Sequence, residues 1–114
     1  MANFGKLLVE LKRDLKVFSI ETEDVVLQNE KYRKDLEKFK FSTDEFRELV
    51  KHLSGNVGNI SLMEAFYKRK SLYRRELYKF RELVLIPGLV SKKDGSNSGI
   101  IDIIDKIIKV IENV

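Results

Sequence analysis

The chain has 114 residues, and its 22 Lys and Arg against 18 Asp and Glu give a net charge of +4. Its apolar content of 43% is typical of a folded chain, and its length predicts a single domain over residues 1–114. The absence of Cys excludes disulfides, thiol catalysis and Cys-based zinc sites. Charges near the N-terminus come too early for a signal peptide, and no apolar run reaches the roughly 18 residues of a membrane span, so we expect a cytoplasmic protein.

The first helix is predicted over residues 3–18, because Phe4, Leu8, Leu11, Leu15 and Phe18 recur at helical spacing. Residues 19–24 then gather Ser, Thr and three acids. Acids in a first turn complement the helix dipole, so a second helix is expected over residues 22–40.

A third helix is predicted over residues 43–54 from the local sequence FSTDEF at 41–46. Ser42 is the expected N-cap, Glu45 completes a capping box, and Phe41 and Phe46 occupy the positions of a hydrophobic staple. Gly55 is the expected left-handed residue at the C-terminal end.

The longest helical pattern predicts a central helix over residues 62–86. Ser61 and Glu64 form a capping box, and Pro87 and Gly88 stop the helix. One stripe is apolar: Leu62, Phe66, Tyr73, Leu77, Phe80 and Val84. Arg69 projects from this stripe, and since buried charges are seldom unpaired, we expect it to pair with Glu76 rather than stand free in a cleft.

The last helix is predicted over residues 100–113, after a loop at 91–99. It is apolar around nearly its whole circumference, which indicates either the centre of a bundle or half of a dimer seam. No stretch predicts a strand. We therefore expect an all-α fold, a compact helical bundle of four to five helices with a long central basic helix.

The central helix carries the strongest binding signal. Between Lys68 and Arg81 it holds seven basic residues and one acid, Glu76, for a local net charge of +6. Two tyrosines lie among them and are able to stack or hydrogen-bond. The predicted binding residues for a protein partner or a polyanion are Tyr67, Lys68, Lys70, Arg74, Arg75, Tyr78, Lys79 and Arg81.

Catalytic signals are sparse: the chain has one His, no Gly-rich phosphate loop and no carboxylate pair at metal-ligand spacing. We expect no enzyme activity, no cofactor and no metal. Arg47 and His52, in the sequence RELVKH, form an Arg-x4-His arrangement that resembles the HEPN ribonucleases, metal-independent helical bundles that join two such motifs across a dimer. Glu48 departs from the Asn, Asp or His usual after that Arg. The alternative is that both residues are solvated near a helix end.

Three functional hypotheses remain open. The first is a non-catalytic, self-associating regulatory protein that binds a protein partner, acidic in character, through the basic helix. The second is a nucleic-acid-binding protein that uses the same helix, or a helix-turn-helix over residues 46–69 with Gly55 in the turn. The third is a HEPN-like ribonuclease. A net charge of only +4 favours the first hypothesis.

Overall fold

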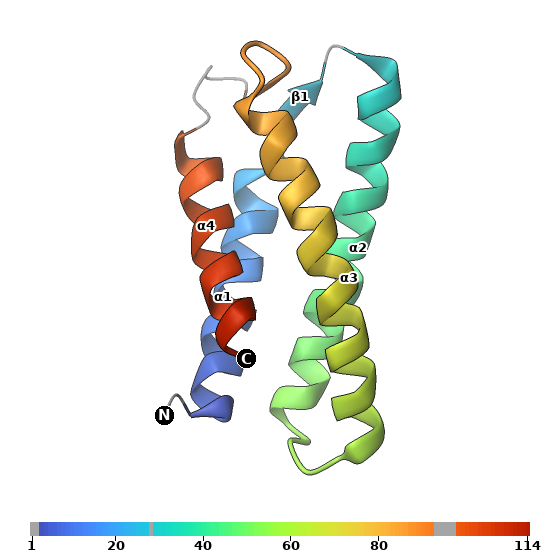
Figure 1. Cartoon of the computed structure of the whole chain (residues 1–114), viewed down its shortest axis with the longest axis vertical. Helices are drawn as coiled ribbons and strands as arrows, with labels where there is room; N and C mark the ends of the chain where they lie inside the picture. Colours follow the sequence, from blue (N-terminus) through green and yellow to red (C-terminus); the bar gives the residue numbers. More distant parts are fainter. Residues whose placement is uncertain (1–2, 28, 93–97) are drawn as a thin grey trace.

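The computed structural model describes residues 3–27, 29–92 and 98–114, which form four helices and two short strands (Figure 1). In chain order these are α1 (Phe4–Glu21), β1 (Val25–Leu27), α2 (Glu30–Ser54), α3 (Ile60–Leu85), β2 (Val90–Lys92) and α4 (Ser98–Asn113). The predicted all-α bundle is confirmed, with four helices over the described residues.

The helices pack in a ring in which α1 touches α2 and α4, and α3 touches the same two helices. They run along the 44 Å long axis of the molecule, and α2 and α3 form an antiparallel hairpin joined at one end by residues 55–59 (Figure 1). All four contribute to one apolar core, whose largest buried side chains include Tyr73, Phe18, Phe46, Phe66, Leu11, Leu53 and Ile104.

The predicted second helix begins later than expected. Thr22 does not start a helix but closes α1, because its hydroxyl donates to the carbonyl of Phe18 at 2.8 Å. Val25–Leu27 then pairs antiparallel with Val90–Lys92, so the prediction that no strand occurs was wrong. The predicted loop at 91–99 is partly wrong for the same reason; residues 93–97 lie outside the described part of the chain, and α4 already includes Ser98 and Gly99.

The break predicted at residues 41–43 is absent, since α2 runs unbroken through it. Ser42 and Thr43 are buried inside the helix, and the Thr43 hydroxyl lies 2.9 Å from the Phe39 carbonyl, four residues back. Phe46 is fully buried as expected, whereas Phe41 is 65% exposed and forms no staple. The residues of the predicted capping motif therefore lie inside a longer helix, where Ser42 contacts Arg69 and Thr43 contacts Tyr73 of α3.

The predicted central helix is confirmed as α3, although Asn59 rather than Ser61 caps it, accepting from the amide of Leu62 at 3.1 Å. Gly55 has a φ of −89° and is not left-handed. The helix-turn-helix prediction is wrong as well, because α2 and α3 are long antiparallel helices of 25 and 26 residues.

The apolar surface of α4 is used inside the chain itself. Its core-facing side chains are buried, several of them completely: Ile100, Ile103, Ile104, Ile107, Ile108, Val110 and Ile111. Helix α4 packs mainly against α1 and secondarily against α3. Of the two interpretations left open by the sequence, the structure supports a core helix. None of the helices described is long and apolar enough to cross a membrane.

Candidate functional site

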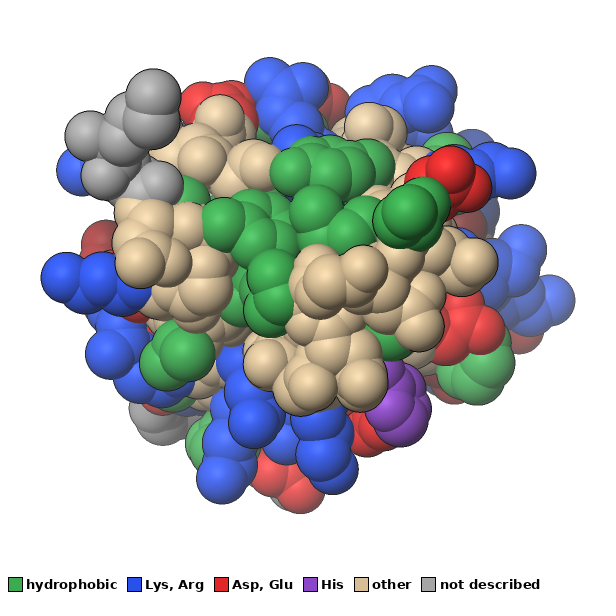
Figure 2. All heavy atoms as spheres, turned by 90° about the horizontal axis from the view of Figure 1, so that it is seen from below, with side chains coloured by type: hydrophobic (Ala, Val, Ile, Leu, Met, Phe, Trp, Pro, Cys, Tyr) green, Lys and Arg blue, Asp and Glu red, His purple; other side chains and the backbone are tan. Residues whose placement is uncertain are grey.

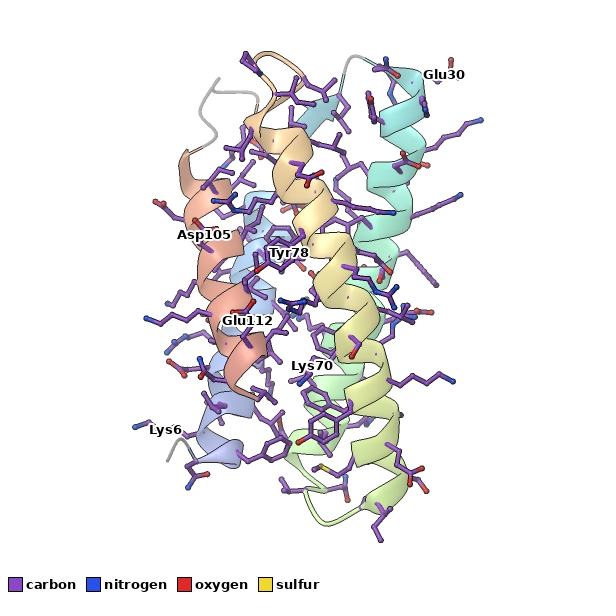
Figure 3. All side chains as sticks on the ribbon, viewed as in Figure 1. Lys6, Glu30, Lys70, Tyr78, Asp105 and Glu112 are labelled. Atoms are coloured by element: carbon purple, nitrogen blue, oxygen red, sulfur yellow. The ribbon has the colours of Figure 1, made fainter. Side chains whose placement is uncertain are left out.

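Six of the eight predicted binding residues fall into two groups on α3. Those turned toward α4 form a polar seam, which we define as Arg74, Tyr78 and Arg81 of α3 with Asp105 and Glu112 of α4 (Figure 3). Those turned away from α4 form an outer face, defined here as Lys68, Arg75 and Lys79, all exposed. Tyr67 and Lys70 belong to neither group.

The seam joins α3 to α4 through hydrogen-bonded ion pairs. Glu112 accepts from Arg74 at 3.0 Å and from the hydroxyl of Tyr78 at 2.9 Å. Asp105 accepts from Nε of Arg81 at 2.7 Å. The guanidinium of Arg74 also lies 5.1 Å from the centre of the Tyr78 ring. Three of the eight predicted binding residues are therefore engaged within the chain.

These contacts set the protonation of the seam. The hydrogen bonds from Arg74 and Tyr78 lower the pKa of Glu112 below its usual value, and the bond to Glu112 raises the pKa of Tyr78. Glu112 is thus an anion over the physiological range. The side chains of Asp105 and Glu112 remain 50% and 43% exposed, so a ligand approaching this side of α3 meets acids as well as bases.

Tyr67 and Lys70 lie nearer the end of the bundle where α3 begins. The ammonium of Lys70 is 4.9 Å from the centre of the Tyr67 ring, and partial burial lowers the pKa of Lys70. Tyr67 packs against Phe4 and Phe66, with ring centres 6.5 and 5.4 Å away, and 41% of its surface remains exposed to solvent. Hydrophobic side chains gather near the middle of this end of the molecule, with Lys, Arg, Asp and Glu toward its edge (Figure 2).

A groove between α2 and α3 was not predicted from the sequence. It has a volume of about 570 Å³. Buried Leu36, Phe39 and Phe80 form its floor, and Phe41 stands exposed at its edge. The charged lining residues are Asp35, Lys38, Arg69, Glu76, Lys79 and Glu82. Phe41 could have been singled out if residues 30–54 had been taken as one helix, since it then falls opposite the apolar stripe.

The sequence predicted that Arg69 pairs with Glu76, and this prediction is wrong. Its guanidinium pairs instead with Glu45 of α2 and donates to the hydroxyl of Ser42 at 3.4 Å. Arg69 and Ser42 both line the groove, so this contact ties the two helices together at the groove's end nearer residues 55–59. The sequence pattern could not reveal the partner, because Glu45 is 24 residues distant.

The Arg47 and His52 pair lies near the C-terminal end of α2. His52 has an exposed side chain 4.0 Å from Glu48, while Arg47 is half-buried one turn earlier. Neither residue lines the groove. Among the described residues, no three His, Cys, Asp or Glu side chains come together in an arrangement suited to a metal ion.

In the comparison with known proteins, no family model, no curated protein and no solved structure matches the chain.

Proposed function

We propose that this chain is a non-catalytic binding protein whose partner is another protein, docked on the outer face of α3. The outer face presents three exposed cations, Lys68, Arg75 and Lys79, and Tyr67 lies 41% exposed on the neighbouring side of α3. Tyr and Arg are enriched among the residues that carry most of the binding energy at protein interfaces. Because no ion pair engages these three cations within the described ranges, the face favours a partner segment that carries acids.

The position of Asp105 and Glu112 favours a protein partner over nucleic acid. Both acids belong to α4, and both remain exposed beside the bases of α3. A phosphate backbone following α3 would meet these carboxylates, whereas affinity for nucleic acid comes from releasing counterions at uninterrupted bases. With Arg69, Arg74 and Arg81 already paired, the local positive field is much weaker than the sequence suggests.

The proposal is tested by selecting displayed random peptides on the immobilised protein at 0.15 M salt. We expect acidic peptides with apolar anchors. Their affinity should fall at least about 30-fold when Lys68, Arg75 and Lys79 are all changed to Glu. The matched control changes Lys6, Lys12 and Lys16 of α1 to Glu, which alters net charge equally on exposed positions and should leave affinity unchanged.

Nucleic acid is the second arm of the same experiment. Mixed-sequence DNA and RNA, single- and double-stranded, should bind weakly at 0.15 M salt, where the Debye length is about 8 Å. Submicromolar binding that tolerates any sequence and disappears in the Lys68, Arg75 and Lys79 variant would reverse the ranking of the two functions.

A further inference from the structure

The groove between α2 and α3 opens beside the outer face of α3. Lys79 belongs to both, since it lines the groove and is one of the three cations of the outer face. Leu72 lies four residues after Lys68 and three before Arg75, so these side chains share one side of the helix. Leu72 is 40% exposed and places an apolar side chain among the cations. We call Lys68, Leu72, Arg75 and Lys79 the α3 rim of the groove.

The α2 side of the groove has a similar composition. Lys34, Lys38 and Phe41 recur at i, i+4 and i+7, so they share one side of α2, and we call them the α2 rim. All three are exposed, Phe41 by 65%, and Lys38 and Phe41 line the groove. Each rim thus carries bases together with one exposed apolar side chain, and the apolar floor of the groove lies between the two rims.

The groove and its rims together have an excess of positive charge. The bases are Lys34 and Lys38 on α2 and Lys68, Arg75 and Lys79 on α3, and the acids are Asp35, Glu76 and Glu82. Arg69 adds no charge, since Glu45 neutralises it. Five bases and three acids leave a net charge of +2. This surface favours an occupant with a few acids beside apolar side chains, whereas a continuous polyanion would meet the three acids as well.

We propose that the partner segment is an amphipathic helix that lies along this groove, with its apolar side on the floor and acids on both flanks. The inference rests on the function proposed above, and it specifies the conformation and chemistry of the partner segment. A helix carries polar side chains on either side of an apolar stripe, so its acids reach both rims at once. In an extended strand, the side chains that do not enter the groove point away from it rather than toward the rims.

The groove fits a helix of about four turns. Arg69 and Ser42 meet at one end, and because α2 and α3 are antiparallel, Tyr32 and Leu83 line the other. From Arg69 to Leu83, α3 advances about 21 Å at about 1.5 Å per residue. A partner segment of about 14 residues therefore covers the floor, and its apolar stripe holds about four side chains at i, i+4, i+7 and i+11.

The acidic peptides selected on the wild-type protein are the probes that test this inference. Phe41→Ser removes an exposed apolar contact without changing charge and should weaken peptide binding at least about 10-fold at 0.15 M salt, measured by fluorescence anisotropy. The matched control, Ile60→Ser, changes a side chain that is 75% exposed near the loop end of α3 and should leave affinity unchanged. Equal affinity of the two variants overturns the inference.

The α2 rim distinguishes this inference from the proposed function, because a segment docked on the outer face of α3 alone does not reach α2. Changing Lys34 and Lys38 together to Glu should weaken peptide binding at least about 10-fold. The control changes Lys6 and Lys12 of α1 to Glu, which alters the charge equally at exposed positions and should have no effect. Peptides that require the outer face but not the α2 rim would retain the proposed function and overturn the groove helix. A selection that returns no acidic peptide overturns both.

The conformation of the bound peptide has its own readout. Circular dichroism of the mixture should show more helix than the sum of protein and peptide measured apart. A Pro in the middle of the peptide should weaken binding at least about 30-fold, because Pro breaks a helix. A bound peptide that gains no helix, or that tolerates the Pro, overturns the inference. So does a wild-type dimer, detected by light scattering, that the peptide converts to monomers, since a second copy then occupies the groove.

Discussion

At the scale of single residues, the most constrained polar contact joins α2 to α3 inside the core. The hydroxyls of Thr43 and Tyr73 lie 2.9 Å apart and both are buried. The Thr43 hydroxyl also lies 2.9 Å from the Phe39 carbonyl. Since a carbonyl only accepts, Thr43 donates to Phe39, and Tyr73 donates to Thr43. The pair therefore explains why a capping residue occurs in the middle of a long helix.

A double-mutant cycle should show that these two side chains act together. Thr43→Val leaves the buried Tyr73 hydroxyl without an acceptor and should lower the free energy of unfolding by about 1–3 kcal/mol. Tyr73→Phe should cost about 0.5–1.5 kcal/mol, because Thr43 still donates to Phe39. The double variant should lose less than the sum, measured by urea denaturation. Strict additivity would mean that the two hydroxyls are not coupled.

Tyr73 also makes the free energy of unfolding depend on pH in the alkaline range. Burial raises the pKa of Tyr73 well above its usual value, an effect that nearby Glu76 and Asp44 reinforce and the hydrogen bond with Thr43 partly opposes. Below about pH 10 the folded and unfolded chains both hold the proton. Above it the unfolded chain releases the proton first, so stability falls as pH rises. The Tyr73→Phe variant should show a shallower decline in unfolding free energy between about pH 10 and 11.

At the scale of elements, α4 contributes more to the core than its 16 residues suggest. Its apolar side chains fill the space between α1 and α3, and its acids bind Arg74 and Arg81. Asp14 of α1 is buried at 1% exposure, 3.5 Å from Lys106 of α4, with no hydrogen bond to either carboxylate oxygen from the described residues. The α1–α4 contact therefore rests mainly on apolar packing, to which Asp14 and Lys106 add a charge contact.

Placing a charge in this core should unfold the chain. Ile104 and Ile107 are both fully buried, and a carboxylate at either position loses its hydration without gaining a partner. We expect Ile104→Asp or Ile107→Asp to lower the free energy of unfolding by more than about 4 kcal/mol, enough to unfold most domains of this size. The control Lys109→Asp lies on the exposed side of α4 and should keep wild-type thermal melting. Wild-type melting of either Ile variant would show that α4 is peripheral.

At the scale of the whole molecule, the proposed binding face lies apart from the Arg47 and His52 pair. His52 is exposed beside Glu48, and catalysis of the HEPN kind would require Arg47 and His52 to meet a second copy. Neither Arg47 nor His52 lies on the outer face of α3 or lines the groove between α2 and α3. The proposed binding face and the resemblance therefore involve different residues.

We accordingly predict no RNA cleavage. Single- and double-stranded RNA incubated with the protein and a metal chelator should stay intact, and His52→Ala should leave the result unchanged. Cleavage by the wild-type chain that is lost in His52→Ala would establish the ribonuclease interpretation.

The sequence by itself determined which residues form most of the helices and which sides of them are buried. The stripe from Phe66 to Val84 and the apolar side of α4 were both predicted, because helical periodicity is local and needs no knowledge of neighbours. Only the tertiary structure decided that Ser42 and Thr43 continue a helix. Their partners, Arg69 and Tyr73, lie 27 and 30 residues away.

The same distinction governs the candidate site. Composition located the bases of α3 but not the acids that neutralise them, since Glu112 and Arg74 are 38 residues apart and Asp105 and Arg81 are 24. The groove likewise exists only where α2 and α3 are packed together, and no local pattern records it. Charge patterns along one helix predict which residues reach the surface, whereas the packing of the neighbouring helix determines which of them remain free to bind.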